Sequence, residues 1–416
     1  MKIAIVTDTY KPRINGVVTS IDTFAEEYRK LGHTVNIIAP DSPERRKKGD
    51  AKEDPDIIKQ DDGVIRIKSR YLFFDPEDRL ADPWLPSSRR KIKKEITSQN
   101  FDIIHTQTPF TLGIEALRWA KKLKCPVVHT YHTMFESYVH YYKFIPFALN
   151  FTKKVSKWYC NKTDMVFTPS SQMKELLLSY KVKKPVQVNP TGIKIDKFKT
   201  INGDDFREKY GISKDTTLLL FMGRIGHEKN IPFLFKVLKE VLRTKPDTKL
   251  IVAGKGTAED EVKAAAIDEG VAENVIFLGY FEPQDWVNCY AAADLFTFAS
   301  ITETQGLVVT EAMAVGTPVV AVGEMGVAEV MAPQKGGVLV KLDVKEFTDA
   351  VLNLLNDREF YEKKKAEAFE YAKEWSAETM AKKMLAGYER AIENKKKELE
   401  EKEAKKRKKR EEKNKR

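Results

Sequence analysis

Two glutamates with seven residues between them, Glu303 and Glu311, could bind two parts of one hydroxyl-rich ligand. A carboxylate accepts hydrogen bonds from hydroxyl groups, so the spacing of the two acids matters. We expect Glu303 in a loop before a helix and Glu311 about two turns inside it, so that the pair brackets a ligand roughly 12 Å long. For an arbitrary pair of glutamates, the commoner explanation is one acid that favours the helix dipole and one solvated helix acid.

The residues between the two acids predict the start of that helix. An apolar run over 295–299 indicates a strand, and the helical pattern that follows ends at Gly316-Thr317-Pro318. The first turn of a helix leaves backbone N–H groups unpaired at the positive end of its dipole. The backbone groups expected to receive hydroxyl or phosphate oxygens belong to Thr304, Gln305, Gly306 and Leu307.

Two cations, Arg224 and Lys229, occupy another loop, which follows an apolar strand over 217–222 and precedes a helix that begins near Pro232. Arginine offers a planar fork of donors and lysine a point charge, so both could converge on a diphosphate. Cations are also common on surfaces, and the residue types alone leave both possibilities open. His227, between the two, has no evident role.

Two further positions follow strands expected in the first half of the chain. His132 lies at the end of a strand over 125–133, at the edge where α/β sheets bind ligands, although a lone histidine there is more often structural. Gly16 and Val17 open a helix after a strand over 2–7, so their N–H groups could meet a diphosphate or simply begin the helix. His105 is expected to be a packing residue.

These residues can converge only if parallel strands carry them to the carboxyl edges of sheets. Strand and helix patterns alternate, which predicts an α/β chain, and 416 residues suffice for two Rossmann-like domains facing a cleft. Gly254 and Gly279 each follow a strand of the second domain. We expect domains over 1–195 and 196–375, a helix crossing back over 376–392 and a charged tail over 393–416.

Composition limits the class of protein. The formal charge is +11, and residues 393–416 contribute +6 of it through 13 Lys or Arg and 7 Glu, so an acidic partner or surface is expected. Three widely spaced cysteines without a paired metal motif fit reduced thiols. The chain contains no run of 18 uncharged apolar residues and no cleavage-site pattern, so we expect a cytoplasmic location.

The segment 138–162 combines aromatic residues and lysines and contains no acid. Phe151, Val155 and Trp158 fall on one helical face, which suits a helix lying in an anionic headgroup layer. A core helix with a solvated face is the alternative, and no recognised nucleic-acid-binding signature accompanies the cluster. The cationic block 405–410 in the tail could contact anionic lipid, contact RNA nonspecifically, or contact nothing.

Five motifs spread over residues 1–390 resemble glycosyltransferase family 4, whose members are retaining enzymes with a GT-B fold of two Rossmann domains. They are Gly16-Val17, His132-Thr133, Gly223-Arg224 with Lys229-Asn230, the turns at Gly254 and Gly279, and the stretch from Glu303 to Glu311. The sequence departs from the family at Lys194, where an aspartate usually follows Gly-Ile.

The resemblance implies a role for each motif. Arg224 and Lys229 would bind the donor diphosphate, Glu303 the donor sugar and Glu311 the ribose, while His132 would lie beside the sugar and assist the transition state. Gly16 and Val17 would close over the phosphates, and the turns at Gly254 and Gly279 would line the base pocket. Neither a metal nor a cofactor is expected at the site, and the acid triplet 54–56 lies in a charge-rich loop that is a poor candidate for one.

The run Glu303-Thr304-Gln305-Gly306 and the run 132–138 look more particularly like bacterial diacylglycerol glycosyltransferases. The resemblance implies transfer of a hexose from a nucleotide sugar, UDP-glucose or UDP-galactose, to diacylglycerol by a protein attached peripherally to the inner face of the cell membrane. The alternatives are the same chemistry on a soluble sugar, a polysaccharide or another lipid, and a nucleotide- or RNA-binding protein without catalysis. No specific nucleic-acid partner is expected.

Overall fold

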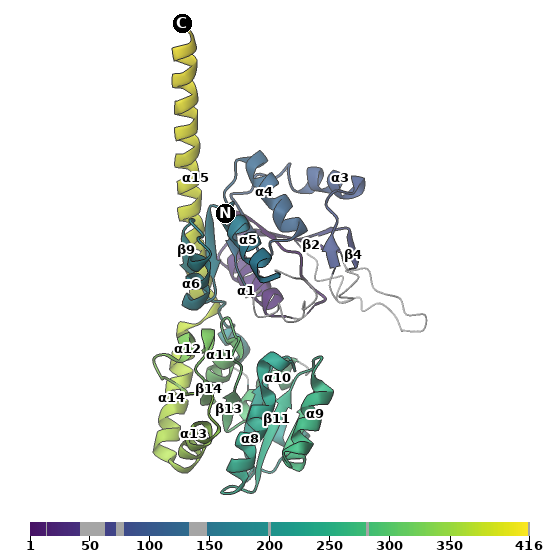
Figure 1. Ribbon diagram of the computed structural model, residues 1–416, viewed down its shortest axis with the longest axis vertical. Coiled ribbons are helices and arrows are strands. Elements are labelled where there is room, and N and C mark those ends of the chain that lie inside the picture. The colour runs from purple at the N-terminus through teal and green to yellow at the C-terminus, as the bar shows by residue number, and fades with distance from the viewer. Residues whose placement is uncertain are drawn as a thin grey trace, which may run out of the picture. The chain divides into compact units, whose positions relative to one another are not determined.

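The computed structural model describes residues 1–13, 15–41, 63–71, 79–132, 148–198, 201–279 and 283–414. The chain forms two compact units (Figure 1). Unit 1 consists of Met1–Pro190 and Met380–Arg416, and unit 2 of Thr191–Thr379. The first crossing between the units therefore comes after Pro190, five residues before the boundary expected from the sequence.

Unit 1 contains a seven-stranded parallel sheet in the order β3-β2-β1-β6-β7-β8-β9. Its strands are β1 (Lys2–Val6), β2 (Thr34–Pro40), β3 (Val64–Ile67), β6 (Ile103–Thr106), β7 (Val127–Thr130), β8 (Met165–Thr168) and β9 (Val186–Val188). Helices α1 (Gly16–Lys30), α3 (Pro86–Glu95), α4 (Thr111–Leu123), α5 (Ala148–Cys160) and α6 (Ser171–Ser179) connect them, and β4 (Ser69–Tyr71) pairs with β5 (Arg79–Ala81) as an antiparallel hairpin. The strands β3 and β9 of this sheet were not predicted from the sequence.

The central strand β1 shows why its residues after Lys2 are all apolar. Ile3 and Ile5 pack into one core of unit 1, whereas Ala4 and Val6 pack into another. Alternate side chains of a strand point to opposite faces, so a sheet with a core on each side needs a continuous apolar run.

The C-terminal helix α15 (Ala377–Asn414) is a single element that includes both the expected crossing helix and the tail. Met384 and Tyr388 are fully buried in a core of unit 1, and the Tyr28 hydroxyl donates to the Tyr388 hydroxyl at 3.1 Å. The helix therefore returns to the first unit, as the sequence indicates.

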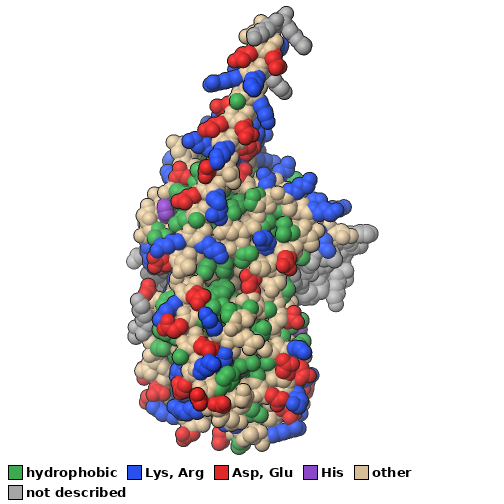
Figure 2. Space-filling model, turned by 90° about the vertical axis from the view of Figure 1, so that its left-hand side faces the viewer, with side chains coloured by type: hydrophobic (Ala, Val, Ile, Leu, Met, Phe, Trp, Pro, Cys, Tyr) green, Lys and Arg blue, Asp and Glu red, His purple; other side chains and the backbone are tan. Residues whose placement is uncertain are grey.

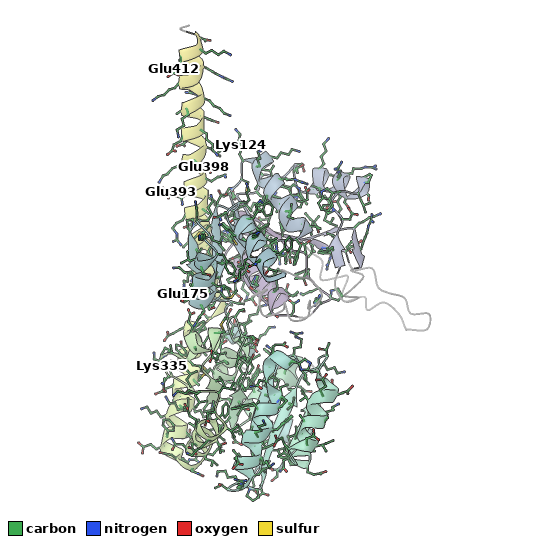
Figure 3. All side chains as sticks on the ribbon, in the orientation of Figure 1. Lys124, Glu175, Lys335, Glu393, Glu398 and Glu412 are labelled. Atoms are coloured by element: carbon green, nitrogen blue, oxygen red, sulfur yellow. The ribbon has the colours of Figure 1, made fainter. Side chains whose placement is uncertain are left out.

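Beyond residue 393, α15 is a charged helix rather than a disordered tail. Ion pairs four residues apart join Glu393 to Lys397 and Glu398 to Lys402, and Lys395 pairs with Asp164 at 3.1 Å. Figure 2 shows acidic and basic side chains interspersed along this part of the helix, and Figure 3 labels Glu393, Glu398 and Glu412 on it. Such pairs support a helix that few apolar contacts hold.

Unit 2 contains a six-stranded parallel sheet in the order β12-β11-β10-β13-β14-β15. The strands are β10 (Thr217–Met222), β11 (Thr248–Ala253), β12 (Val275–Leu278), β13 (Leu295–Phe298), β14 (Val319–Val322) and β15 (Gly337–Val340). The helices are α7 (Gly203–Lys209), α8 (Ile231–Leu242), α9 (Glu259–Asp268), α10 (Pro283–Ala292), α11 (Leu307–Ala314), α12 (Met325–Met331), α13 (Val344–Asn356) and α14 (Arg358–Glu374). Both units thus have the Rossmann-like parallel arrangement that the sequence predicts.

Helix α5 occupies the second half of the aromatic and basic segment, and residues 133–147 lie outside the described part of the chain. The side chains of Phe151 and Trp158 are 67% and 46% exposed, and Lys154 beside them is also exposed. Among the helices that the structure describes, none is both long and apolar enough to cross a membrane.

Candidate active site

The loop between β13 and α11 carries the glutamate motif, and its geometry depends on Gly306. This residue precedes α11 with φ +79°, in the left-handed region where glycine is unstrained. Because α11 begins at Leu307, Glu311 is its fifth residue and lies about one turn inside the helix, or ~6 Å along the axis. The expectation that Glu311 lies two turns inside the helix was wrong, because the loop continues as far as Gly306.

Lys229 and Glu303 come together at this loop as an ion pair. Lys229 closes a 3-10 turn (His227–Lys229) after β10, and the two side chains are only 16% and 19% exposed. Partial removal from water strengthens the attraction between two charges, so each side chain holds the other in position. The expected sugar-binding acid and one expected diphosphate-binding cation are therefore neighbours.

Arg224 lies in the same loop but pairs with a different acid. Its guanidinium donates to Glu228 at 2.5 Å, and the arginine side chain is 53% exposed. The second oxygen of Glu228 is buried and has no hydrogen-bond partner in the structure. Arg224 is thus the more accessible of the two cations, and Glu228 is an acid of the site that the sequence analysis did not identify.

Gly254 joins the loops at the ends of β10, β11 and β12. Its N–H donates to the Leu278 carbonyl at 2.9 Å, and the Ile225 N–H donates to the Lys255 carbonyl at 3.0 Å. A Cβ atom on Gly254 would lie 2.0 Å from the Gly223 carbonyl oxygen, and one on Gly279 would lie 2.8 Å from a carbon of the Lys255 side chain. Gly254 is therefore required for close packing of the loop that carries Arg224, whereas at Gly279 the Lys255 side chain could move aside.

Gly326 supports the glutamate loop from α12, and sequence reasoning missed it. Its N–H donates to the Glu303 carbonyl at 2.8 Å, and a Cβ atom there would lie 2.4 Å from the Thr304 carbonyl oxygen. A signal was available, because the run 323–326 follows β14 and contains two glycines. Thr304 lies next to this contact, so Gly326 shapes the backbone on which the expected ligand contacts depend.

Glu311 is a partly buried acid with one direct partner. The Tyr290 hydroxyl donates to its carboxylate at 2.9 Å, and Tyr290 itself is fully buried. Burial raises the pKa of Glu311 to about 7, although the Tyr290 hydrogen bond and the charge of Lys197 act in the opposite direction. Near neutral pH the group can therefore be a neutral acid or a charged acceptor.

In unit 1, His132 follows β7 by two residues, and its Nε2 lies 2.6 Å from the Gln107 Oε1. Burial lowers the pKa of His132 to about 4, so the ring is neutral at pH 7. His105, by contrast, is fully buried between the Tyr388 hydroxyl at 2.5 Å and Thr130 at 2.7 Å, which is a packing role.

Gly16 is the first residue of α1 and is exposed, and no atom lies within 4 Å of the position that a Cβ atom would take there. The Asn15 side chain caps the helix by accepting from the Val18 N–H at 3.0 Å. Gly16 and Val17 therefore occupy the first turn of a capped helix, where backbone N–H groups face outward.

In the described part of the chain, His, Cys, Asp and Glu side chains do not gather in a group of three or more that could hold a metal ion. The acid triplet 54–56 lies outside the described residues. All three cysteines are free and buried.

The chain matches two family models that together cover most of its length. Residues 14–197 match Glycosyltransferase Family 4, and residues 202–375 match Glycosyl transferases group 1. Over 330 residues the chain is 38% identical to an alpha-monoglucosyldiacylglycerol synthase of Streptococcus pneumoniae, covering 78% of this chain and 71% of that protein. It is 29% identical to the synthase of the same name from Acholeplasma laidlawii, covering 77% of this chain and 80% of that protein.

Solved structures agree on the fold. The structure of Anabaena HepE in complex with UDP and glucose superposes with a TM-score of 0.73 at 16% identity, covering 93% of this chain and 99% of that one. A sucrose-phosphate synthase from Thermosynechococcus elongatus has a TM-score of 0.72 at 19% identity, covering 94% and 99%. With its two Rossmann-like units and both family matches, the chain belongs to glycosyltransferase family 4 and is a glycosyltransferase of the GT-B fold.

Proposed function

We propose that this protein transfers a hexose from a UDP-sugar, UDP-glucose or UDP-galactose, to diacylglycerol and forms an α-monoglycosyl-diacylglycerol. The observation that carries the proposal is the 38% identity to a monoglucosyldiacylglycerol synthase over 78% of this chain. The pairing of Lys229 with Glu303 supports it, because both groups that a sugar diphosphate would need lie side by side.

The proposed reaction keeps the configuration of the sugar and needs no metal ion. The bond between the anomeric carbon and the diphosphate oxygen breaks, and the electron pair leaves with the diphosphate. Arg224 and Lys229 would stabilise that charge electrostatically. The acceptor hydroxyl attacks the anomeric carbon from the same face, and its proton passes to the departing diphosphate. Neutral His132 would lie beside the sugar as a hydrogen-bonding group rather than as a nucleophile.

Donor binding would exchange partners at the ion pair. In the structure, the Lys229 ammonium and the Glu303 carboxylate form an ion pair. A diphosphate can replace Glu303 as the partner of Lys229, which leaves the carboxylate to accept hydrogen bonds from sugar hydroxyls. Because the exchange replaces one charged contact with another, neither group is left buried and unpaired.

Affinity for UDP-glucose is expected to rise as the pH increases through the pKa of Glu311. At pH 6 about one tenth of this carboxyl is charged and at pH 8 about nine tenths, given its pKa of about 7. A carboxylate accepts stronger hydrogen bonds from ribose hydroxyls than a neutral acid, so the dissociation constant should fall about 10-fold over this range. Calorimetric titration measures it, and E311Q should bind with little pH dependence. An unchanged pH dependence in E311Q would assign the effect to another group.

The membrane interaction is proposed for the exposed face of α5. Phe151 and Trp158 are exposed there beside Lys154, and an aromatic and basic helix face binds anionic headgroups. This would attach the protein peripherally to the inner face of the cell membrane, where diacylglycerol is available. The cationic block 405–410 of α15 is a second candidate contact with the same surface.

Replacing Phe151 and Trp158 together with serine is expected to lower the fraction of protein that cosediments with phosphatidylglycerol vesicles at least about 10-fold, because each ring contributes apolar area to the interface. The matched control is F369S, which removes an exposed aromatic ring from α14 of unit 2. Equal vesicle binding by the double variant and the wild type would exclude this face.

The proposed function is tested with a panel of UDP- and GDP-sugars and mixed vesicles of diacylglycerol and anionic phospholipid, followed by mass spectrometry of the lipid. A hexose added to diacylglycerol from one donor supports the reaction, the acceptor and the sugar together. Transfer to a soluble sugar without a lipid product would exclude diacylglycerol as the acceptor. Nucleotide or RNA binding without any sugar transfer would contradict the proposal that the protein is a catalyst.

A further inference from the structure

Gln305 is the residue of the glutamate loop whose side chain turns away from the expected ligand contacts into the protein. It is 6% exposed, and its amide pairs with the backbone of one residue, Thr191. The Thr191 N–H donates to its Oε1 at 2.7 Å, and its Nε2 donates to the Thr191 carbonyl at 2.6 Å. A glutamine amide contains both an acceptor and donors, so a single side chain satisfies the backbone N–H and the backbone carbonyl of Thr191.

Thr191 is the first residue of unit 2 and directly follows Pro190, the last residue of the first segment of unit 1. Gln305 therefore binds the segment through which the chain passes from one unit to the other. This contact lies within unit 2, and it joins that segment to the loop between Glu303 and Leu307.

The same segment is bonded to the place where the chain leaves unit 2. The Ile193 N–H donates to the Trp375 carbonyl and the Ala377 N–H donates to the Ile193 carbonyl, both at 2.8 Å. A Cβ atom on Gly192 would lie 2.5 Å from the Ala377 Cα, so the two backbones are in direct contact. The two segments that connect the units are thus hydrogen-bonded to each other, and Gln305 links them to the glutamate loop.

We propose that Gln305 is a positioning residue. It couples nucleotide-sugar binding in the glutamate loop to the conformational ordering of the two segments that connect the units, residues 191–193 and 375–377. The coupling rests on the proposed function, because it requires a donor that binds this loop. A ligand that fixes the backbone of Thr304 to Leu307 also fixes the Gln305 side chain, and through it the backbone of Thr191. By reciprocity, a change in the connecting segments alters the affinity or geometry of the loop.

The test is hydrogen exchange of the full-length protein with and without saturating UDP, read in peptides that cover residues 186–195 and 372–380. In the wild type, UDP is expected to slow exchange in both peptides about 10-fold. Q305M keeps the length of the side chain and removes both hydrogen bonds, whereas Q305E keeps only the acceptor for the Thr191 N–H. Q305M should lose the UDP-dependent protection and Q305E should retain part of it.

Steady-state kinetics and UDP titration separate this role from a merely structural one. Q305M is expected to have a UDP dissociation constant within about 3-fold of the wild-type value, while its kcat falls about 10-fold. A smaller fraction of folded protein would lower the apparent kcat but would not produce the loss of UDP-dependent protection in the same variant. Q99L, which removes an amide side chain from unit 1, is the control and should match the wild type in both readouts.

The coupling would be contradicted if UDP slowed hydrogen exchange in Q305M as much as in the wild type. Equal losses of UDP affinity and kcat in Q305M would also contradict it. If the wild type itself binds no UDP, the proposed function fails and the coupling fails with it. If the wild type binds UDP and transfers sugar without protecting residues 186–195, the coupling alone fails.

Discussion

Replacing Lys229 with alanine is expected to lower kcat about 1,000-fold while the protein remains folded. The Lys229 side chain is 16% exposed in the structure, and its ammonium would face the charge that develops on the leaving diphosphate. Removing it also leaves the Glu303 carboxylate without its partner in a site that water only partly reaches. Turnover of UDP-sugar with saturating acceptor measures kcat, and thermal unfolding shows whether the fold persists.

E303A should lower kcat by a similar factor, and combining the two substitutions tests whether the residues act as a unit. The double variant should lose far less than the product of the single effects, because each single variant already disrupts the pair. K364A is the matched control: it removes the lysine of another partly buried pair in unit 2, Lys364–Glu367 at 2.9 Å, with side chains 11% and 27% exposed. It should lower the unfolding temperature without changing kcat. Turnover in K229A within about 3-fold of the wild type would remove Lys229 from the site.

Replacing Gly254 with alanine is expected to destabilise unit 2 by about 3 kcal/mol. Its φ of +132° is a conformation that side chains disfavour, and the new Cβ would lie 2.0 Å from the Gly223 carbonyl oxygen. Relief of the clash would separate the ends of β10 and β11 and displace the loop that carries Arg224. Urea denaturation followed by probes in each unit measures the loss, which should appear in the unit 2 transition.

G270A separates backbone strain from the steric clash. Gly270 also has a positive φ, +74°, but nothing lies within 4 Å of the Cβ position. Only the conformational cost applies there, so a loss of about 1 kcal/mol is expected. Equal losses in G254A and G270A would contradict this expectation, because only G254A adds the contact with the Gly223 carbonyl and a φ of +132°, which lies outside the left-handed helical region.

The architecture was predictable because its signals are local. The apolar run of β1 and the helical pattern of α1 follow from periodicity within a few residues, and the structure places both elements within one residue of the expected ends. The short strands β3 and β9 were missed, because three or four residues at a sheet edge carry little periodic signal. The depth of Glu311 in α11 was misjudged, since the left-handed Gly306 precedes the helix and leaves Glu311 only about one turn inside it.

By itself the sequence determined the family and the two Rossmann-like units, and it predicted the candidate site residues, because these motifs follow strands whose carboxyl ends lie at one edge of each sheet. Only the tertiary structure decided which of these residues touch. The pairing of Lys229 with Glu303, the support of Glu303 by Gly326 and the bond between Gln305 and Thr191 join positions 74, 23 and 114 residues apart. The same holds for the raised pKa of Glu311, which depends on burial beside Tyr290. Such contacts form only when separate elements pack, and no local pattern of residues encodes them.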